Sequence, residues 1–467
     1  MATPKKLHIA MFPWLAFGHM LPFFELAKNI ARKGHNVSFI STPKNIKRLP
    51  EIPPNLSPLM NFVSLALPHQ ANLPHEAEAT TDLPFPKIQY LKIAYDNLQN
   101  PLSQILQTSS PDWIIYDGFA YWSAPIAREL GISCMYFSIF PAWSICFCGS
   151  STTAMINGED PRTKAEDFTV PPQWVPFPSN VAFRLHEAKK LLVHFEEDDS
   201  GVSDLFRAGS AIAGCDVMAI KSSMELEPEW LSLLAKLHGK PIVPIGLLPP
   251  LEKDYRENTT EHKAWLVICK WLEKQKTGSV IYVALGSEIN PSQEDITELA
   301  LGLELSGLPF FWSLRKQHSS VELPEGFQER VKERGVVWTS WAPQLKILSH
   351  DSVGAFLTHC GLNSIIEALC HGRPLILLAF VMDHGLASRV FAEKKAGIEI
   401  KRKEEDGKFR RESVAETVKV VIDEEEGRVY REKAMEMRNI IADKELENEY
   451  TDNFIKLLEN YRQISTA

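Results

Sequence analysis

The sequence predicts an α/β protein made of two doubly wound domains, each a parallel sheet covered by helices. The chain has 467 residues, which is more than one hydrophobic core usually accommodates, so two domains are expected. Apolar stretches of strand length also alternate with helical stretches in two separate series. A helical crossover between consecutive strands makes the sheet parallel, so each series predicts its own parallel sheet.

The first series opens with the apolar run Leu7–Pro13, which we expect to be a strand. The apolar positions that follow recur with the period of a helix, and Pro22 and Gly34 are typical of a helix's first turn and of its end. The further strands expected in this series are Val37–Ser41, Trp113–Tyr116 and Cys134–Ser138. Residues 150–200 have the least regular pattern and are expected to form loops.

The second series begins near Ser279. Its expected strands are Val280–Leu285, Phe310–Leu314, Val336–Thr339, Val353–Thr358 and Leu375–Phe380, and its expected helices are Gln293–Leu305 and Asn363–Cys370. Between the two series, Pro241–Asn258 is rich in proline and charge, as is typical of a linker. The expected division is an N-terminal domain over 1–245, a linker over 246–260, a C-terminal domain over 261–444, and a helix over 445–467 that packs back toward the N-terminal domain.

Composition and short motifs argue against several classes of protein. The net charge of −9 and the pI near 5.9 disfavour nucleic acid as a partner. No stretch approaches the length of a membrane span, and the opening apolar run is too short for a secretory signal. We therefore expect a cytoplasmic protein with seven reduced cysteines. Neither the glycine fingerprint of dehydrogenases nor a P-loop is present, which disfavours an oxidoreductase and an NTPase.

The most informative segment runs from Trp341 to His384 and reads WAPQLKILSHDSVGAFLTHCGLNSIIEALCHGRPLILLAFVMDH. Within it, Thr358–Ser364 joins an expected strand to an expected helix. The backbone N–H groups and the dipole at the start of a helix favour a diphosphate there. Gly361 permits a close approach of the backbone. The segment therefore predicts a site for a phosphorylated ligand.

This segment resembles the 44-residue donor box of the plant secondary-product UDP-glycosyltransferases, plant family 1. Its length and spacing match the box, and the resemblance extends over essentially the whole chain. It implies a fold of the GT-B type, in which two Rossmann-like domains face each other across a cleft. It also implies that the chain uses a UDP-sugar, as a co-substrate and not as a cofactor.

The resemblance assigns roles within the box. It implies that Trp341, with Ala342 beside it, stacks on uracil, that Gln344 supports the edge of the base, and that Glu367 holds the ribose hydroxyls. The residues that it implies for the diphosphate are His359, Asn363 and Ser364. Gly361 lets the backbone come close, and Ser287, in an earlier turn that follows a strand, is placed to add another phosphate contact. The donor site is thus expected to lie in the C-terminal domain.

Three positions of the box concern the sugar. Asp383 and His384 stand where the family places its sugar-contacting pair, and His384 departs from the usual Gln. Leu362 replaces a Trp, which removes an indole donor and adds apolar surface. An ending of Asp-His is similar to members that use UDP-rhamnose, although His also occurs in users of galactose and arabinose. A 6-deoxy sugar suits a less polar pocket, so UDP-rhamnose is expected first and UDP-glucose next, with UDP-galactose and UDP-arabinose left open.

His19 and Asp117 are the predicted catalytic residues. Each follows an expected strand, so both are expected at the same rim of the sheet. A histidine can take a proton from an acceptor hydroxyl, and a carboxylate on its other nitrogen fixes the tautomer. The matching positions of the family carry this pair, which implies an inverting displacement. No Asp-x-Asp motif is placed to hold a metal against a diphosphate, so we expect neither a metal nor a cofactor.

Aromatic residues that follow the catalytic strands suit a large, flat, apolar acceptor. The expected acceptor-binding residues are Phe119, Tyr121, Trp122, Phe140 and Trp143, whereas Phe137 and Phe147 are expected in the core. The opening MFPWLAFGHMLPFFELAK is similar to the branch of the family that adds a sugar to a sugar. A flavonoid, terpenoid or steroid glycoside is thus the expected acceptor, and the protein is expected to be a monomer. A non-catalytic protein that binds a UDP-sugar or a small molecule is the alternative, against which the His19–Asp117 pair argues.

Overall fold

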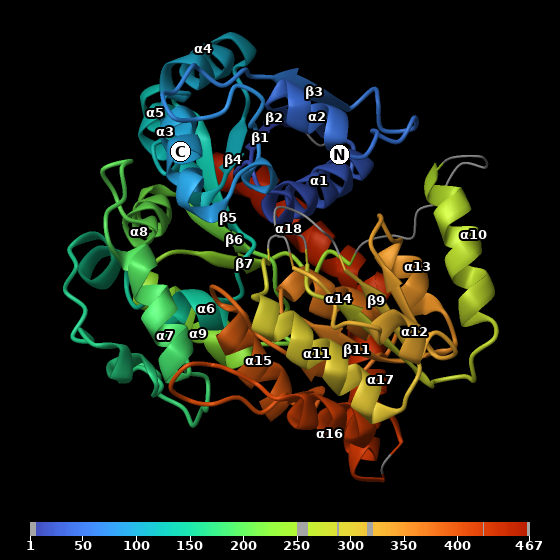
Figure 1. Ribbon diagram of the computed structural model, residues 1–467. Coiled ribbons are helices and arrows are strands. Elements are labelled where there is room, and N and C mark those ends of the chain that lie inside the picture. The colour runs from blue at the N-terminus through green and yellow to red at the C-terminus, as the bar shows by residue number, and fades with distance from the viewer. Residues whose placement is uncertain (1–5, 250–259, 287–288, 315–320, 424, 465–467) are drawn as a thin grey trace.

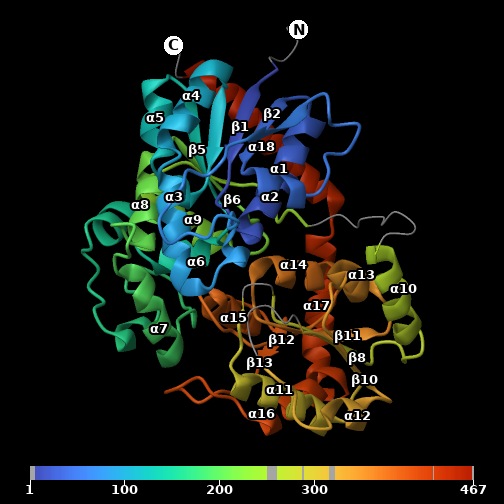
Figure 2. The same ribbon diagram turned by 45° about the horizontal axis from the view of Figure 1, so that its top comes forward.

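Two parallel sheets organise the chain, as Figures 1 and 2 show for the N-terminal lobe in blue to green and the C-terminal lobe in yellow to orange. The computed structural model describes residues 6–249, 260–286, 289–314, 321–423 and 425–464. The expected linker lies partly outside this range, at 250–259. The α/β class with two doubly wound sheets is confirmed.

Within the described residues, the first sheet has seven parallel strands in the order β3-β2-β1-β4-β5-β6-β7. They are β1 (His8–Phe12), β2 (Asn36–Ser41), β3 (Met60–Ser64), β4 (Trp113–Tyr116), β5 (Ser133–Ser138), β6 (Val217–Ile220) and β7 (Ile242–Pro244). The strand order reverses between β1 and β4, which are neighbours in the sheet. Such a switch point leaves a crevice at the carboxyl ends of the two strands.

The second sheet repeats this plan with six described parallel strands in the order β10-β9-β8-β11-β12-β13. They are β8 (Val280–Ala284), β9 (Phe310–Ser313), β10 (Gly335–Trp338), β11 (Val353–Thr358), β12 (Leu375–Leu377) and β13 (Gly397–Glu399). Its order reverses between β8 and β11. Each sheet therefore offers one crevice at which a ligand can bind.

Helices cover both faces of each sheet. Those of the N-terminal lobe are α1 (Phe17–Arg32), α2 (Pro43–Arg48), α3 (Ile88–Asp96), α4 (Gln99–Ser109), α5 (Ser123–Glu129), α6 (Ala142–Phe147), α7 (Leu185–Leu191), α8 (Asp204–Gly214) and α9 (Pro228–His238). Those that follow are α10 (Thr260–Leu272), α11 (Gln293–Ser306), α12 (Phe327–Val331), α13 (Gln344–Ser349), α14 (Leu362–Cys370), α15 (His384–Glu393), α16 (Arg411–Ile422), α17 (Arg428–Ile441) and α18 (Lys444–Ile464). Shorter helical turns are η1 (Thr80–Asp82), η2 (Phe85–Lys87), η3 (Gly118–Ala120), η4 (Ser151–Ile156), η5 (Ala165–Phe168), η6 (Leu192–Phe195) and η7 (Glu425–Gly427).

Three local predictions were wrong. Residues 150–200, which were expected to form loops, contain α7 and the helical turns η4, η5 and η6. The segment assigned to a linker from Pro241 contains β7, which pairs with β6 at the edge of the sheet. An edge strand tolerates proline because its outer N–H groups need no partner, so the prolines that indicated a linker are compatible with a strand. Pro22 also lies inside α1 and not in its first turn, because the helix already begins at Phe17.

The C-terminal helix α18 packs on the N-terminal lobe, where Figure 2 shows it in red behind the first sheet. Phe454, Ile455 and Leu458 are buried in the same hydrophobic cluster as Trp113 of β4. The indole Nε1 of Trp113 donates to the carbonyl oxygen of Leu458 over 3.2 Å. The last helix thereby ties the C-terminal end of the chain to the first sheet.

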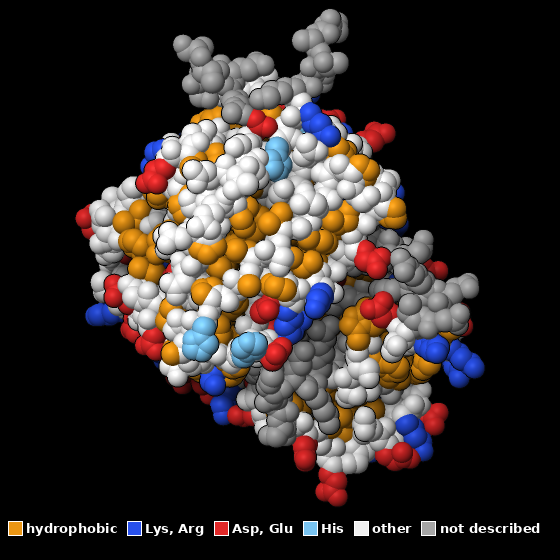
Figure 3. All heavy atoms as spheres, turned by 90° about the horizontal axis from the view of Figure 1, so that it is seen from above, with side chains coloured by type: hydrophobic (Ala, Val, Ile, Leu, Met, Phe, Trp, Pro, Cys, Tyr) orange, Lys and Arg blue, Asp and Glu red, His pale blue; other side chains and the backbone are white. Residues whose placement is uncertain are grey.

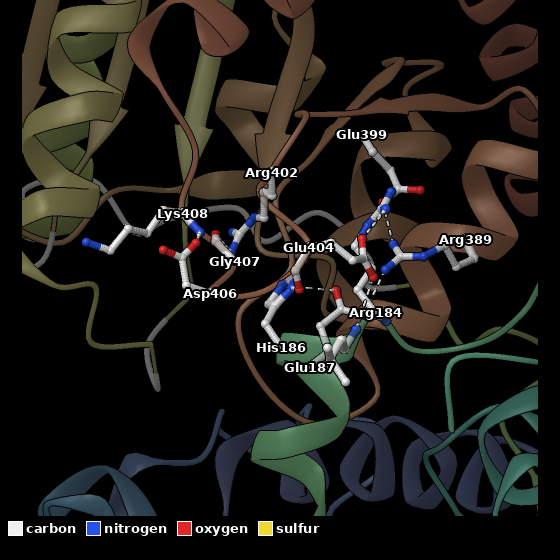
Figure 4. A network of polar contacts seen from close by, with 11 residues as sticks. Arg184, His186, Glu187, Arg389, Glu399, Arg402, Glu404, Asp406, Gly407 and Lys408 are labelled. Atoms are coloured by element: carbon white, nitrogen blue, oxygen red, sulfur yellow. Dashed lines mark hydrogen bonds and ion pairs between the residues drawn. The ribbon is translucent and has the colours of Figure 1, made fainter. Parts of the chain in front are cut away.

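A polar network joins the lobes at α7, as Figure 4 shows. The guanidinium of Arg389 on α15 contacts Glu187 of α7 at 2.7 Å and Glu399 of β13. Arg184, which precedes α7, contacts the carboxylates of Glu399 and Glu404, each at 3.2 Å. Arg389 and Glu187 are about nine-tenths buried. These paired charges fix the N-terminal lobe against the part of the C-terminal lobe that carries the end of the predicted donor box.

The expectations from composition concern the surface charge and the cysteines. On the face shown in Figure 3, Lys and Arg side chains are separated by acidic, polar and hydrophobic ones and form no extended basic area. All seven cysteines fall in the described residues and are free thiols. Among the helices that the structure describes, none is both long enough and apolar enough to cross a membrane.

Candidate active site

The predicted catalytic pair meets at the crevice of the first sheet. His19 lies in the first turn of α1, directly after β1, and Asp117 directly follows β4, the neighbouring strand. The Nδ1 atom of His19 lies 2.8 Å from Oδ2 of Asp117. The two side chains are 12% and 4% exposed, so the pair is largely shielded while the imidazole keeps some access to solvent.

The contact determines which nitrogen of His19 can act as a base. A carboxylate accepts hydrogen bonds, so Nδ1 carries the proton that is shared with Asp117. This tautomer leaves Nε2 as the basic nitrogen. Asp117 is held in turn, because its Oδ1 accepts the backbone N–H of Phe119 over 3.4 Å. The geometry can therefore support proton abstraction from a hydroxyl group.

Aromatic rings line the surroundings of His19. The rings of Phe119 and Phe140 are centred 6.1 and 5.7 Å from the imidazole, and both meet it edge to face. Trp14 stacks on Phe119 with 4.4 Å between centroids. Phe119 and Phe140 are only partly buried. They are thus the predicted acceptor residues that the structure brings beside the dyad.

The other predicted acceptor residues lie farther into the protein. Tyr121 packs against Phe206 and lies under the guanidinium of Arg207. Trp122 is 5% exposed and donates its indole N–H to Asp96 over 3.0 Å, while Trp143 is fully buried. Burial gives Trp122 and Trp143 mainly packing roles, because little of their surface is exposed. Phe137 and Phe147 are core residues, as expected.

Trp143 lies beside a cavity and not beside His19. It borders a cavity of about 160 Å³ that Trp230 of α9 and Val390 of α15 also line. Its ring meets Phe391 of α15 edge to face, with 6.1 Å between centroids. Trp143 therefore serves the contact between the lobes.

The predicted donor helix starts at the crevice of the second sheet. Between β11 and α14, Cys360 adopts a φ of 72°, a left-handed conformation that turns the chain sharply. Gly361 precedes α14, and no side chain caps the start of this helix. Its first N–H groups are therefore left as possible donors to an anion.

His359 makes glycine necessary at two places. A Cβ atom on Gly361 would lie 2.5 Å from Nε2 of His359, and one on Gly286 would lie 2.8 Å from the same ring. The sequence assigned the small size of Gly361 to a close approach of phosphate. The structure shows in addition that the imidazole of His359 occupies the space between the two turns.

His359 and His384 form an edge-to-face pair with 4.9 Å between ring centroids. Burial lowers the pKa of His359 to about 4. Burial, and then the neighbouring His359, lower the pKa of His384 well below its usual value. The Nδ1 atoms of both rings are buried without a hydrogen-bond partner. Two neutral imidazoles with unused polar atoms therefore stand beside the start of α14.

Two of the residues predicted for the nucleoside, Gln344 and Glu367, are brought together. Nε2 of Gln344 donates to Glu367 over 2.6 Å and to Ser364 over 3.2 Å. Burial raises the pKa of Glu367, and the hydrogen bond from Gln344 opposes this rise. Trp341 is 39% exposed, as a platform for a planar base requires, whereas the adjacent Ala342 is buried. Ser287 lies outside the described residues.

Contacts between the lobes bring the two crevices together. Asn363, in the first turn of α14, donates from Nδ2 to the carbonyl oxygen of Gly18 over 3.3 Å. Ser144 of α6 donates to Oδ2 of Asp383 over 3.0 Å. Burial raises the pKa of Asp383, and the hydrogen bond from Ser144 opposes this rise. The catalytic pair, the start of α14 and the C-terminal end of the donor box therefore lie at one site.

Three residues of this site were not predicted from the sequence. Ser144 contacts Asp383, Glu227 holds the start of α6 through the backbone N–H groups of Ala142 and Trp143, and Lys221 donates to Oδ1 of Asn363. Lys221 directly follows β6, a strand that was not assigned from the sequence. The apolar run Val217–Ile220, ended by a lone lysine, is the signal that could have indicated it.

The comparison with known sequences decides the family. UDP-glycosyltransferase 91B1 of Arabidopsis thaliana is 50% identical over 98% of this chain and 99% of its own length. The chain belongs to the plant UDP-glycosyltransferases. The family model described as UDP-glucoronosyl and UDP-glucosyl transferase matches residues 266–450 of this glycosyltransferase. This range contains the whole predicted donor box.

Further relatives and solved structures support the assignment. Soyasaponin III rhamnosyltransferase of Glycine max is 43% identical to this UDP-glycosyltransferase over 99% of the chain and 97% of the relative. The crystal structure of Glycyrrhiza uralensis UGT73P12 complexed with glycyrrhetinic acid 3-O-monoglucuronide has a TM-score of 0.79 at 21% identity, over 99% of this chain and 98% of that one. That of Arabidopsis thaliana UGT89C1 complexed with UDP-L-rhamnose has a TM-score of 0.71 at 24% identity, over 97% and 99%. The GT-B fold is thereby confirmed, and the protein is a UDP-sugar-dependent glycosyltransferase.

Proposed function

We propose that this UDP-glycosyltransferase transfers rhamnose from UDP-rhamnose, with glucose from UDP-glucose as the next choice, to a hydroxyl of a plant glycoside. The observation that carries the proposal is the His19–Asp117 contact of 2.8 Å, next to a backbone carbonyl that binds the donor helix. A base and a diphosphate-binding helix at one place can carry out transfer to a hydroxyl. A binding protein has no need of the base.

The proposed reaction is a single displacement. Nε2 of His19 takes the proton of the acceptor hydroxyl, and the acceptor oxygen forms a bond to the anomeric carbon. The bond from that carbon to the β-phosphate oxygen breaks, and UDP leaves with the electron pair. Attack from the face opposite UDP inverts the configuration. A positioned base typically contributes about 10²–10⁴-fold, and the alignment of the two substrates contributes further.

The donor sugar is proposed from Leu362 and His384. Leu362 is the first residue of α14, and His384 is the first of α15. A neutral imidazole and a leucine make a less polar pocket than the Gln and Trp of the usual box, which suits a 6-deoxy sugar. Two relatives are named rhamnosyltransferases, the soyasaponin III enzyme and anthocyanidin-3-O-glucoside rhamnosyltransferase of Petunia hybrida, which is 34% identical over 89% of this chain.

The acceptor is proposed to be a flavonoid, terpenoid or steroid that already carries a sugar. The aromatic rings of Phe119 and Phe140 beside His19 suit a flat apolar ring system. The names of the two rhamnosyltransferases refer to a saponin and to an anthocyanidin glucoside. The monomeric state and the cytoplasmic location expected from the sequence remain predictions.

Metal independence is also part of the proposal. Among the described residues, no group of three or more His, Cys, Asp or Glu side chains could hold a metal ion. The uncapped start of α14 supports binding of the diphosphate without a metal ion, because backbone N–H groups can neutralise its charge. Activity that survives EDTA is the expected outcome, and loss of activity that added Mg²⁺ or Mn²⁺ restores would contradict it.

The test is a UDP-release assay of the purified protein with UDP-rhamnose, UDP-glucose, UDP-galactose and UDP-arabinose. Each donor is paired with a panel of flavonoid, triterpenoid and steroid glycosides and their aglycones. Release that is fastest with UDP-rhamnose and a glycoside supports the proposal. Fastest release with another donor overturns the sugar assignment, and binding of UDP without any release favours a non-catalytic binding protein.

A further inference from the structure

Lys221 is a buried cation without a carboxylate partner. It is 3% exposed and lies at the end of β6, in the N-terminal lobe. Its Nζ donates to Oδ1 of Asn363, on the other lobe. Within the described part of the chain, no carboxylate forms an ion pair with it. Because a buried charge without a counter-charge is costly, this position requires an explanation beyond packing.

The surroundings of Lys221 are acidic but not in contact with it. Glu367 and Cys370 face it from α14, Glu447 faces it from α18, and Glu25 faces it from α1. All three of these carboxyl groups have other partners. Glu367 accepts from Gln344, Glu447 accepts from the backbone N–H groups of Leu247 and Leu248, and Glu25 forms an ion pair with Lys28 at 2.6 Å. Lys221 therefore has the amide oxygen of Asn363 as its direct acceptor.

This hydrogen bond fixes the orientation of the Asn363 amide. An ammonium group only donates, so it must face Oδ1 and never the NH₂ group. The NH₂ group then points away from Lys221, where it donates to Gly18. The chain of contacts runs from Lys221 through Asn363 to Gly18, which immediately precedes His19.

We propose that Lys221 is a positioning residue for the UDP-sugar donor. It acts through Asn363, whose amide it orients at the start of α14, and its charge favours the diphosphate that binds there. This inference rests on the proposed function, because it assumes that the start of α14 receives the diphosphate. It adds a cation from the N-terminal lobe to a donor site that the sequence placed in the C-terminal domain.

The test is calorimetric binding of UDP and of uridine to the full chain. Lys221→Met is expected to weaken UDP binding by at least about 10-fold, because a buried hydrogen-bonded charge is removed. Uridine lacks the diphosphate, so its affinity is expected to change less than about 2-fold. Lys221→Arg keeps the charge and the donor and is expected to restore most of the affinity for UDP. Lys240→Met is the matched control, because Lys240 donates to the carbonyl oxygens of Ala213 and Cys215 in the same lobe.

A pH series separates charge from packing. Burial lowers the pKa of Lys221 to about 8. The ratio of UDP to uridine affinity should therefore fall as the pH rises through about 8 in the wild type, and it should stay flat in Lys221→Met. Uridine contains the same base, so ionisation of uracil affects both ligands. The acidic groups around Lys221 are common to both proteins.

The outcomes are distinguishable. Equal affinities of wild type and Lys221→Met for UDP would overturn the inference, as would an equal loss for UDP and uridine. Failure of the wild type to bind UDP at all would instead overturn the proposed function. If Lys221→Met does not fold, Lys221→Gln and the pH series on the wild type provide the same comparison, and a flat wild-type ratio would overturn the inference.

Discussion

Asn363 donates from Nδ2 to the carbonyl oxygen of Gly18 over 3.3 Å, which joins the donor helix to the turn that carries His19. The carbonyl of Gly18 is available because Pro22 lies four positions later in the helix. In a regular helix the N–H of residue 22 would bond to Gly18, but Pro22 has no N–H. A proline inside α1 thus leaves an acceptor for the other lobe.

Replacing Pro22 by Ala is expected to weaken this link. The new N–H can bond to Gly18 within the helix and compete with Asn363. We expect kcat/KM to fall about 2- to 10-fold, the equivalent of one hydrogen bond. The melting temperature should stay unchanged or rise, because proline costs stability inside a helix. Wild-type kcat/KM in a variant that folds would show that the Gly18 contact does not matter for transfer.

His19→Ala tests the base. Loss of the imidazole should reduce kcat at least about 100-fold. The dissociation constant for UDP should remain within about 2-fold, because the nucleotide is expected to bind in the other lobe. Turnover from UDP release and UDP affinity from calorimetry provide the two values. His75→Ala is the control, since His75 is 93% exposed and should be replaceable without effect. Wild-type turnover in His19→Ala would remove the histidine from the mechanism.

The sugar preference should respond to Leu362→Trp combined with His384→Gln. The changes restore the usual indole and amide donors of the box, which a hexose with a 6-hydroxyl can use. We expect the ratio of kcat/KM for UDP-glucose to that for UDP-rhamnose to rise about 10- to 200-fold, the range that one such pocket contact provides. The measurement is a competition between the two donors with one acceptor. An unchanged ratio would assign the preference to other residues.

Glu227 should make stability depend on pH. Burial raises the pKa of its carboxyl group from 4.5 to about 7, against the backbone N–H groups of Ala142 and Trp143. Between pH 4.5 and 7 the folded state thus binds more protons than the unfolded chain, so stability falls as the pH rises through this window. We expect the wild-type melting temperature to fall by on the order of a few degrees across this window because of Glu227, and we expect Glu227→Gln to remove this fall. An identical slope in both proteins would contradict the assignment.

Arg389→Met should loosen the contact between the lobes that Figure 4 shows. The change leaves the largely buried carboxylate of Glu187 without its guanidinium partner, and it leaves Glu399 with Arg184 alone. Breaking a buried pair in this way is expected to cost about 3–5 kcal/mol of unfolding free energy. Denaturant titration measures it, with Arg428→Met as the control because Arg428 is 63% exposed and its ion pairs face solvent. Equal stability of the two variants would show that the network contributes little.

Local patterns predicted most strands of the fold. Trp113–Tyr116 and Val353–Thr358 are strands with the expected bounds, because buried parallel strands are continuous apolar runs. Short edge strands such as β3 and β7 were missed, since an edge strand is partly exposed and tolerates polar residues and proline. Pro22 led to a wrong start for α1. A proline is common in the first turn of a helix, but here the turn after β1 places the start of the helix at Phe17, five residues earlier.

The sequence by itself determined the chemistry that is present, namely a histidine and an aspartate after two strands and a donor box of matching spacing. It did so because strand ends and helix starts are local features, and a parallel sheet brings its carboxyl ends to one edge. Only the tertiary structure decided which aromatic residues face His19, that Lys221 from one lobe orients Asn363 on the other, and that His359 and His384 pair as neutral rings. These contacts join residues far apart in the chain, and their burial and partners exist only once the two lobes pack together.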